Sequence, residues 1–160
     1  MLFEHIIEVT NPAEEGPMIT RTQLWNGLLL RAEAPDLFME GIEAVDIIER
    51  HSDHIVREIQ LGKFRVRDDI RFEYNAAVHY ETAPSDVHGG GKLTMRIESP
   101  EEGHLFVRFT YDTPVPDTGD SEEAKLSGYL KSAYQQMDMD TIRTILEMAV
   151  DGELPGGVAH

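Results

Sequence analysis

The segment "LGKFRVRDDIRFEY", residues 61–74, carries the strongest information about the fold of this chain. In an extended strand successive side chains point to opposite faces, so alternate residues share a face. One face is then charged, and the other carries Phe64, Val66, Ile70, Phe72 and Tyr74. Asp68 breaks this pattern, because it falls in the middle of the apolar row. An unpaired carboxylate against a protein core is energetically costly, so Asp68 is expected to have a partner or a shifted pKa.

A partner follows from the turn that precedes this strand. A two-residue loop at Gly62–Lys63, with glycine first, favours a type II′ hairpin turn. Leu61 then opposes Phe64, and counting outward along both strands places Arg57 opposite Asp68. These two opposite charges share an otherwise apolar face, and a shift of one residue would destroy the match. The sequence therefore predicts a hairpin with an inward-facing Arg57–Asp68 ion pair.

Two interpretations of this pair stay open. In the first, it is a partly buried salt bridge, or a bulge at Asp68–Asp69 turns Asp68 outward, and neither has a direct function. In the second, Arg57 and Asp68 are polar groups in an apolar cavity, where they orient a ligand. Arg57 would then bind a carboxylate or carbonyl group, and Asp68 would hold Arg57 in place or accept a proton.

The rest of the sequence predicts an α+β fold. Strand-like segments cover residues 1–10, 42–50, 54–62, 64–74, 76–82, 92–99 and 104–112. Two short helices are expected at 20–33 and 35–40, and a long one at 121–150. We expect a seven-stranded, curved antiparallel sheet wrapped around the C-terminal helix. The helix would cover the sheet with a stripe that consists of Leu126, Leu130, Ala133 and Met137. A cavity is expected where the curved sheet bends away from the straight helix.

Composition limits the class of protein. The 160 residues fit a single domain, expected at 1–151, and residues 152–160 are expected to form a disordered tail. A formal net charge of −16 opposes binding to a nucleic-acid backbone. No apolar segment is long enough to cross a membrane, and the N-terminus does not resemble a signal peptide. The absence of cysteine agrees with a reducing cytoplasmic location. The sequence indicates neither a cofactor motif nor a complete set of metal ligands.

The segment "AAVHYETA", residues 76–83, offers a second candidate for acid–base chemistry. If Ala77 faces the interior, His79 and Glu81 line the cavity and are able to exchange protons near neutral pH. In the alternative arrangement Val78 and Tyr80 face the interior and both titratable groups face solvent. We favour this second arrangement.

Several segments resemble one branch of a known superfamily. They are "ITRTQLWNGLLLRAEAPDLF" (residues 19–38), Gly41–Ile42, Arg57–Glu58, Leu61–Phe64 and "LFVRFTYD" (residues 105–112). With the order of strands and helices, they resemble the AtaL-like proteins of the Bet v 1/START (SRPBCC) superfamily, which have a helix-grip fold. The resemblance implies a cavity for hydrophobic small molecules under the long helix. Some superfamily members are cyclases or hydratases, but the branch supplies no catalytic residues.

Three functional hypotheses follow. The leading one is binding of a hydrophobic or aromatic small molecule between the sheet and the C-terminal helix, in a monomer or homodimer. Arg57 and Asp68 would be the polar contacts, and the walls would include Trp25, Phe38, Phe64, Val66, Phe72, Met95, Phe109, Leu130 and Met137. The second hypothesis is a cyclase- or hydratase-type lyase with Asp68 or His79 as general acid or base. The third is a protein-interaction module whose cavity is filled by its own side chains.

Overall fold

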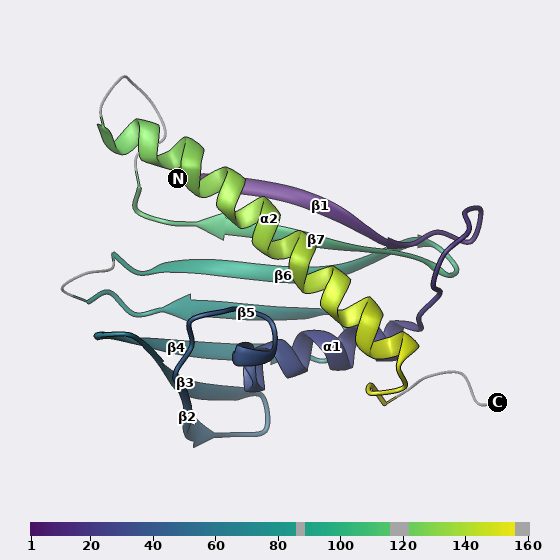
Figure 1. Ribbon diagram of the computed structural model, residues 1–160, viewed down its shortest axis with the longest axis horizontal. Helices are drawn as coiled ribbons and strands as arrows, with labels where there is room; N and C mark the ends of the chain where they lie inside the picture. Colours follow the sequence, from purple (N-terminus) through teal and green to yellow (C-terminus); the bar gives the residue numbers. More distant parts are fainter. Residues whose placement is uncertain (86–88, 116–121, 156–160) are drawn as a thin grey trace.

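The sheet contains seven antiparallel strands in the order β1-β7-β6-β5-β4-β3-β2 (Figure 1). The computed structural model describes residues 1–85, 89–115 and 122–155. The strands are β1 (Leu2–Thr10), β2 (Ala44–Arg50), β3 (His54–Leu61), β4 (Phe64–Glu73), β5 (Ala77–Thr82), β6 (Gly91–Glu101) and β7 (His104–Asp112). The helices are α1 (Arg21–Glu33), the 3-10 turn η1 (Pro35–Leu37) and α2 (Glu122–Val150). The predicted fold class and order of elements are confirmed.

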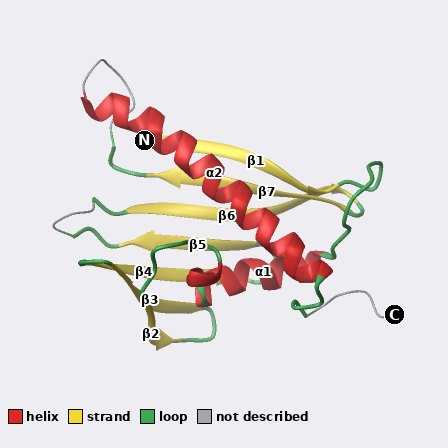
Figure 2. Ribbon diagram, in the orientation of Figure 1, coloured by secondary structure: helices red, strands yellow, loops and turns green. Residues whose placement is uncertain are grey.

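Both α-helices lie on the same face of the sheet, which we call the inner face (Figure 2). Neither α1 nor α2 lies on the opposite face, which we call the outer face. Alternation along each strand places apolar side chains on the inner face, where they pack against the helices. The centre of the core contains Leu28, Ile70, Val78, Phe109 and Ile145, all fully buried.

The β3–β4 hairpin has the predicted register. Leu61 pairs with Phe64, Ile59 with Val66, and Arg57 with Asp68, and no shift interrupts the pairing. Gly62 has a φ of 58°, a left-handed conformation that glycine adopts without strain and that a type II′ turn requires at its first position. The interpretation of Asp68–Asp69 as a bulge is therefore wrong.

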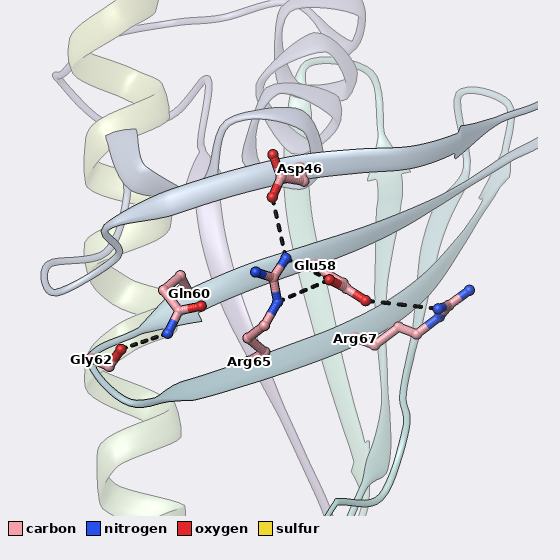
Figure 3. A network of polar contacts seen from close by, with 6 residues as sticks. All are labelled: Asp46, Glu58, Gln60, Gly62, Arg65 and Arg67. Atoms are coloured by element: carbon pink, nitrogen blue, oxygen red, sulfur yellow. Dashed lines mark hydrogen bonds and ion pairs between the residues drawn. The ribbon is translucent and has the colours of Figure 1, made fainter.

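The outer face of this hairpin is charged (Figure 3). Arg65 donates hydrogen bonds from Nε and Nη2 to Glu58 Oε2, at 3.0 and 2.6 Å, and its Nη2 reaches Asp46 at 3.3 Å. Arg67 lies 3.8 Å from the other Glu58 oxygen. The same two strands therefore carry a solvent-exposed set of ion pairs on one face and the apolar row on the other.

Helix α1 begins with a capping box. The Gln23 backbone amide donates to Thr20 Oγ1 at 3.0 Å, and the Thr20 amide donates to the Gln23 side chain at 2.9 Å. Farther along, Gly27 faces α2: a Cβ atom built on it would lie 2.7 Å from a methyl carbon of Ile145. The two helices approach this closely because residue 27 has no side chain.

Helix α2 crosses the inner face obliquely, from the β1 edge toward α1 (Figure 1). The side of the helix that packs on the sheet carries Ser127, Asp138, Ile142 and Ile145, which are buried, with Tyr134 partly buried among them. The expected covering stripe is therefore wrong. Leu126 is 47% exposed, Ala133 is exposed, and Leu130 and Met137 are only partly buried.

The segment after α2 differs from the expected disordered tail. Residues 152–155 are ordered against the protein, and Leu154 is buried in the core. The Asn26 side chain of α1 also donates to the Pro155 carbonyl at 3.1 Å. Residues 156–160, the remainder of the expected tail, lie outside the described part of the chain.

Candidate functional site

Two adjacent rows of side chains cross the inner face of the sheet. Strand pairing aligns the first row, which we call the floor row: Ile70, Tyr80, Leu93 and Tyr111. The second, which we call the polar row, runs from Arg57 through Asp68 and Thr82 to Gly91. Leu93 is only partly buried, whereas its neighbours in the floor row are buried. These rows bring together residues from five strands.

The Arg57–Asp68 ion pair is present and faces inward. Arg57 donates from Nε to Asp68 Oδ2 at 3.0 Å, and the residues are 3% and 4% exposed. Arg57 Nη1 donates to the Ala32 carbonyl near the end of α1 at 2.7 Å, and Thr82 donates to Asp68 Oδ1 at 2.6 Å. Protein groups therefore engage both side chains, and the pair connects the end of α1 to the sheet.

A second polar centre joins α1, β5 and α2 through Arg31 and Tyr80. Both are buried, and the Arg31 guanidinium carbon lies 5.4 Å from the centre of the Tyr80 ring. Arg31 Nε donates to Thr141 Oγ1 of α2 at 3.2 Å. Burial alone would lower the pKa of Arg31, but Tyr80, Tyr111 and Asp138 outweigh this effect and raise it, so the guanidinium stays charged.

The Tyr80 hydroxyl has no hydrogen-bond partner among the described residues, although Tyr80 is 5% exposed. Arg31 is close enough to Tyr80 for the two groups to interact, and this interaction raises the pKa of Arg31, but the Tyr80 hydroxyl makes no hydrogen bond of ordinary distance and angle within the described residues. Nearly all buried polar groups in proteins are hydrogen-bonded, so an unpaired hydroxyl needs an explanation.

A third centre lies beside α2, where Asp138 is fully buried. The Tyr111 hydroxyl lies 2.7 and 2.8 Å from the two Asp138 oxygens and donates to them, and His5 Nε2 lies 2.7 Å from Oδ2. Tyr134 of α2 stacks on Tyr111 with ring centres 4.0 Å apart. Burial raises the pKa of Asp138, although hydrogen bonds from Tyr111 and His5 act in the opposite direction. Burial and the Asp138 carboxylate also raise the pKa of Tyr111.

Arg31, His5 and Asp138 were not predicted as site residues, although the sequence carries a signal for the first two. Arg31 follows Leu24 by seven residues and Leu28 by three, which places it on the buried side of α1. His5 alternates with Phe3 and Ile7 on the inner side of β1. These are charged or titratable residues on apolar faces, the same feature that identified Asp68.

The position of α2 over the sheet fixes where its apolar stripe (Leu126, Leu130, Ala133 and Met137) points. Tyr134 and Asp138 hold the helix over Tyr111, and Thr141 reaches sideways to Arg31 beside Tyr80. Met137 lies one helical turn before Thr141, so it shares this side of the helix. The stripe therefore continues along the side of the helix that carries Thr141, the side next to Arg31.

The other predicted wall residues divide into two groups. Trp25, Met95 and Phe109 are buried in the core, and Trp25 packs edge-to-face with Tyr74. The partly exposed ones are Phe38, Val66 and Phe72, with Phe64 49% exposed at the start of β4. Phe72 lines a separate depression of about 490 Å³ beneath α1, with Leu29, Leu30 and Ile55.

His79 and Glu81 lie on the outer face, in the arrangement that we favoured. His79 Nε2 is 3.0 Å from Glu73 Oε2, and its Nδ1 is 3.1 Å from Thr94 Oγ1. Both residues line an open depression of about 360 Å³ with His54, Asp69, Arg71, Tyr80, Lys92 and Thr94. The sheet therefore separates His79 from Asp68, so the two do not act at one inner site.

The curved seven-stranded sheet with its long C-terminal helix is a helix-grip fold of the Bet v 1-like type. The chain resembles the crystal structure of Zhui aromatase/cyclase from Streptomyces sp. R1128 with a TM-score of 0.68 and 14% identity, over 99% of both chains. The di-domain aromatase/cyclase StfQ of the steffimycin pathway matches with a TM-score of 0.68 and 12% identity, over 94% of this chain and 51% of that one. Ara h 8.0201 matches with a TM-score of 0.58 and 14% identity, over 92% of this chain and 98% of that one.

Residues 6–152 match the family model AtaL, described as acetylaranotin biosynthesis cluster protein L. The chain belongs to this family. No curated protein has significant sequence similarity to it. Within residues 1–85, 89–115 and 122–155, neither α-helix has the length and hydrophobicity needed to span a membrane.

Proposed function

We propose that this protein binds a hydrophobic or aromatic small molecule on the inner face of the sheet, between the apolar stripe of α2 and the floor row. The observation that carries the proposal is the stripe itself. Its four apolar residues do not cover the sheet, and they remain partly or largely exposed. Ligand sites are typically apolar surfaces with a few placed polar groups, and Arg31, Tyr80 and Thr82 supply such groups here.

The family and the fold support an organic small molecule as the ligand. The family description names a biosynthesis cluster, and two proteins of similar fold are aromatase/cyclases. A fold hosts many functions, so these likenesses favour the class of ligand and not a particular reaction.

Fluorescence titration with the neutral aromatic probe N-phenylnaphthylamine tests this proposal. Leu130→Gln places a polar group on the apolar stripe, and we expect it to weaken binding about fivefold or more. Because Leu130 is only partly buried, the fold should tolerate the change. Leu29→Gln is the matched control, since it makes the same change in the depression beneath α1.

Binding that responds to Leu29→Gln and not to Leu130→Gln would move the site beneath α1 and overturn the proposed location. A wild-type protein that binds no probe, and that shows no co-purified molecule by native mass spectrometry, would contradict ligand binding altogether. That result would favour an interaction module with a filled interior.

A lyase is the second candidate function, favoured by the buried Asp138 beside Tyr111, His5 and Arg31. Burial raises the pKa of this carboxyl, which favours the protonated form that a general acid needs. Asp68 is less suited, because it forms a buried ion pair with Arg57, and His79 lies on the outer face. Compounds that stabilise the fold in a thermal-shift screen should then be converted to a product detectable by mass spectrometry. Asp138→Asn should abolish conversion while binding persists; unchanged conversion would exclude Asp138 as the acid or base.

A further inference from the structure

Two hydrogen-bond donors lie side by side in the interior with unused capacity. The Tyr80 hydroxyl has no partner among the described residues. The Arg31 guanidinium carries five N–H donors. The one hydrogen bond that it donates among the described residues runs from Nε to Thr141 Oγ1. Both residues are more than nine-tenths buried. Buried donors without acceptors are energetically unfavourable, so each needs an explanation, and a ligand that supplies the acceptor is one.

The neighbouring carboxylates are already engaged. Tyr111 and His5 bind the Asp138 oxygens at 2.7 and 2.8 Å. Arg57 and Thr82 bind the Asp68 oxygens at 3.0 and 2.6 Å. The protein therefore surrounds Arg31 and Tyr80 with acceptors that serve other donors.

These donors lie at the inner end of the proposed binding region. Tyr80 is the neighbour of Leu93 in the floor row, and Arg31 contacts Thr141, one turn beyond Met137 of the apolar stripe. A ligand that lies along the stripe would therefore reach Arg31 and Tyr80 with one end. The guanidinium of Arg57 also lies 5.4 Å from the Tyr80 ring centre, which adds positive charge nearby.

We propose that the ligand carries an oxygen acceptor, as a carboxylate, enolate or similar oxyanion attached to an aromatic or apolar body, and that Arg31 and Tyr80 bind this oxygen. The inference rests on the proposed function, which it deepens by naming the polar group of the ligand. A charged donor in a low-dielectric interior forms a stronger hydrogen bond than it does in water. The net charge of −16 repels anions in general. Binding of an anionic ligand must therefore depend on positive charge within the site itself, which Arg31 supplies.

A matched pair of probes separates the two proposals. N-phenylnaphthylamine is neutral, and anilinonaphthalene sulfonate adds one anionic group to the same aromatic skeleton. Tyr80→Phe removes the unpaired hydroxyl. We expect it to weaken binding of the sulfonate probe about tenfold and binding of the neutral probe less than twofold. Arg31→Lys keeps the positive charge but replaces the planar guanidinium and its several N–H donors with a single ammonium group. It should therefore also weaken binding of the sulfonate probe and leave binding of the neutral probe unchanged. Tyr129→Phe is the control, because it makes the same change at an exposed tyrosine of α2.

Thermal unfolding without probe supplies a second readout. Because the Tyr80 hydroxyl is unpaired, Tyr80→Phe should leave the midpoint unchanged or raise it. Loss of stability in Tyr80→Phe would indicate a structural hydroxyl and overturn the inference. Equal affinities of wild type, Tyr80→Phe and Arg31→Lys for the sulfonate probe would overturn it while the proposed function stands. Absence of binding by both probes in the wild type would overturn both.

Discussion

Arg57 of β3 and Asp68 of β4 are direct partners across the hairpin, and together they are the buried link between the sheet and the end of α1. Each charge is balanced by the other and by further hydrogen bonds. This link holds α1, and with it Arg31, in a fixed position over the floor row.

Removal of one member of this pair should destabilise the protein strongly. Asp68→Asn or Arg57→Met leaves a buried charge without its partner, which costs about 3–5 kcal/mol. The double variant Arg57→Met/Asp68→Leu should lose much less stability, because neither buried charge remains. Urea unfolding followed by circular dichroism measures both free energies.

The outer face of the same hairpin offers the control. Arg65 makes hydrogen bonds to Glu58 as short as those of Arg57, but its side chain is 55% exposed (Figure 3). Arg65→Met should therefore cost far less than Arg57→Met, since solvent screens exposed pairs. Equal losses on the two faces would show that burial does not set the strength of the inner pair.

Gly27 should be intolerant of even the smallest side chain. Ala is the better helix former, but its Cβ would lie 2.7–3.0 Å from three carbons of the buried Ile145. Overpacking of this kind costs about 1–3 kcal/mol. Gly128→Ala, where the new Cβ meets nothing within 4 Å, should stabilise α2 instead. Thermal or urea unfolding of both variants measures this difference.

The double variant Gly27→Ala/Ile145→Ala tests the cause. If the clash with Ile145 is responsible, the second substitution should relieve it, and the two free-energy losses should sum to more than the loss of the double variant. Additive losses would point to a different origin.

Asp138 should make stability depend on pH in a defined direction. Burial raises its pKa in the folded protein above the ordinary value of 3.8. The contribution of Asp138 to the free energy of unfolding is therefore fully present below pH 3.8. It is lost as the pH rises through the pKa that Asp138 has in the folded protein. Asp138→Asn does not titrate, so the free energy of unfolding of wild type minus that of the variant should fall as the pH rises above about 4.

Urea unfolding of both proteins at a series of pH values gives the difference directly, because titratable groups remote from Asp138 contribute equally to both proteins. His5, Tyr111 and Arg31 face Asp138 and are retained in the variant. A difference that rises with pH would mean that these partners lower the pKa of Asp138 and outweigh its burial.

The order of elements could be predicted because local sequence decides it. Gly62 sets the turn, alternation sets the faces of the strands, and the two together placed Arg57 opposite Asp68. For α2 the same reasoning failed. The stripe of Leu126, Leu130, Ala133 and Met137 is the most apolar side in sequence, yet Tyr134 and Asp138 engage Tyr111 and rotate the helix away from it.

Local sequence was enough to predict the strands, the hairpin register and the inward ion pair, because these depend on contacts between residues that are close along the chain or locked by a turn. Packing between distant segments brings Arg31, Tyr80 and Asp138 close together and leaves the Tyr80 hydroxyl without a hydrogen-bond partner among the described residues. Those residues come from α1, β5 and α2, and the oblique crossing of α2 over the sheet sets their separation. That crossing is fixed by packing among distant segments, such as Gly27 against Ile145, which no local pattern encodes.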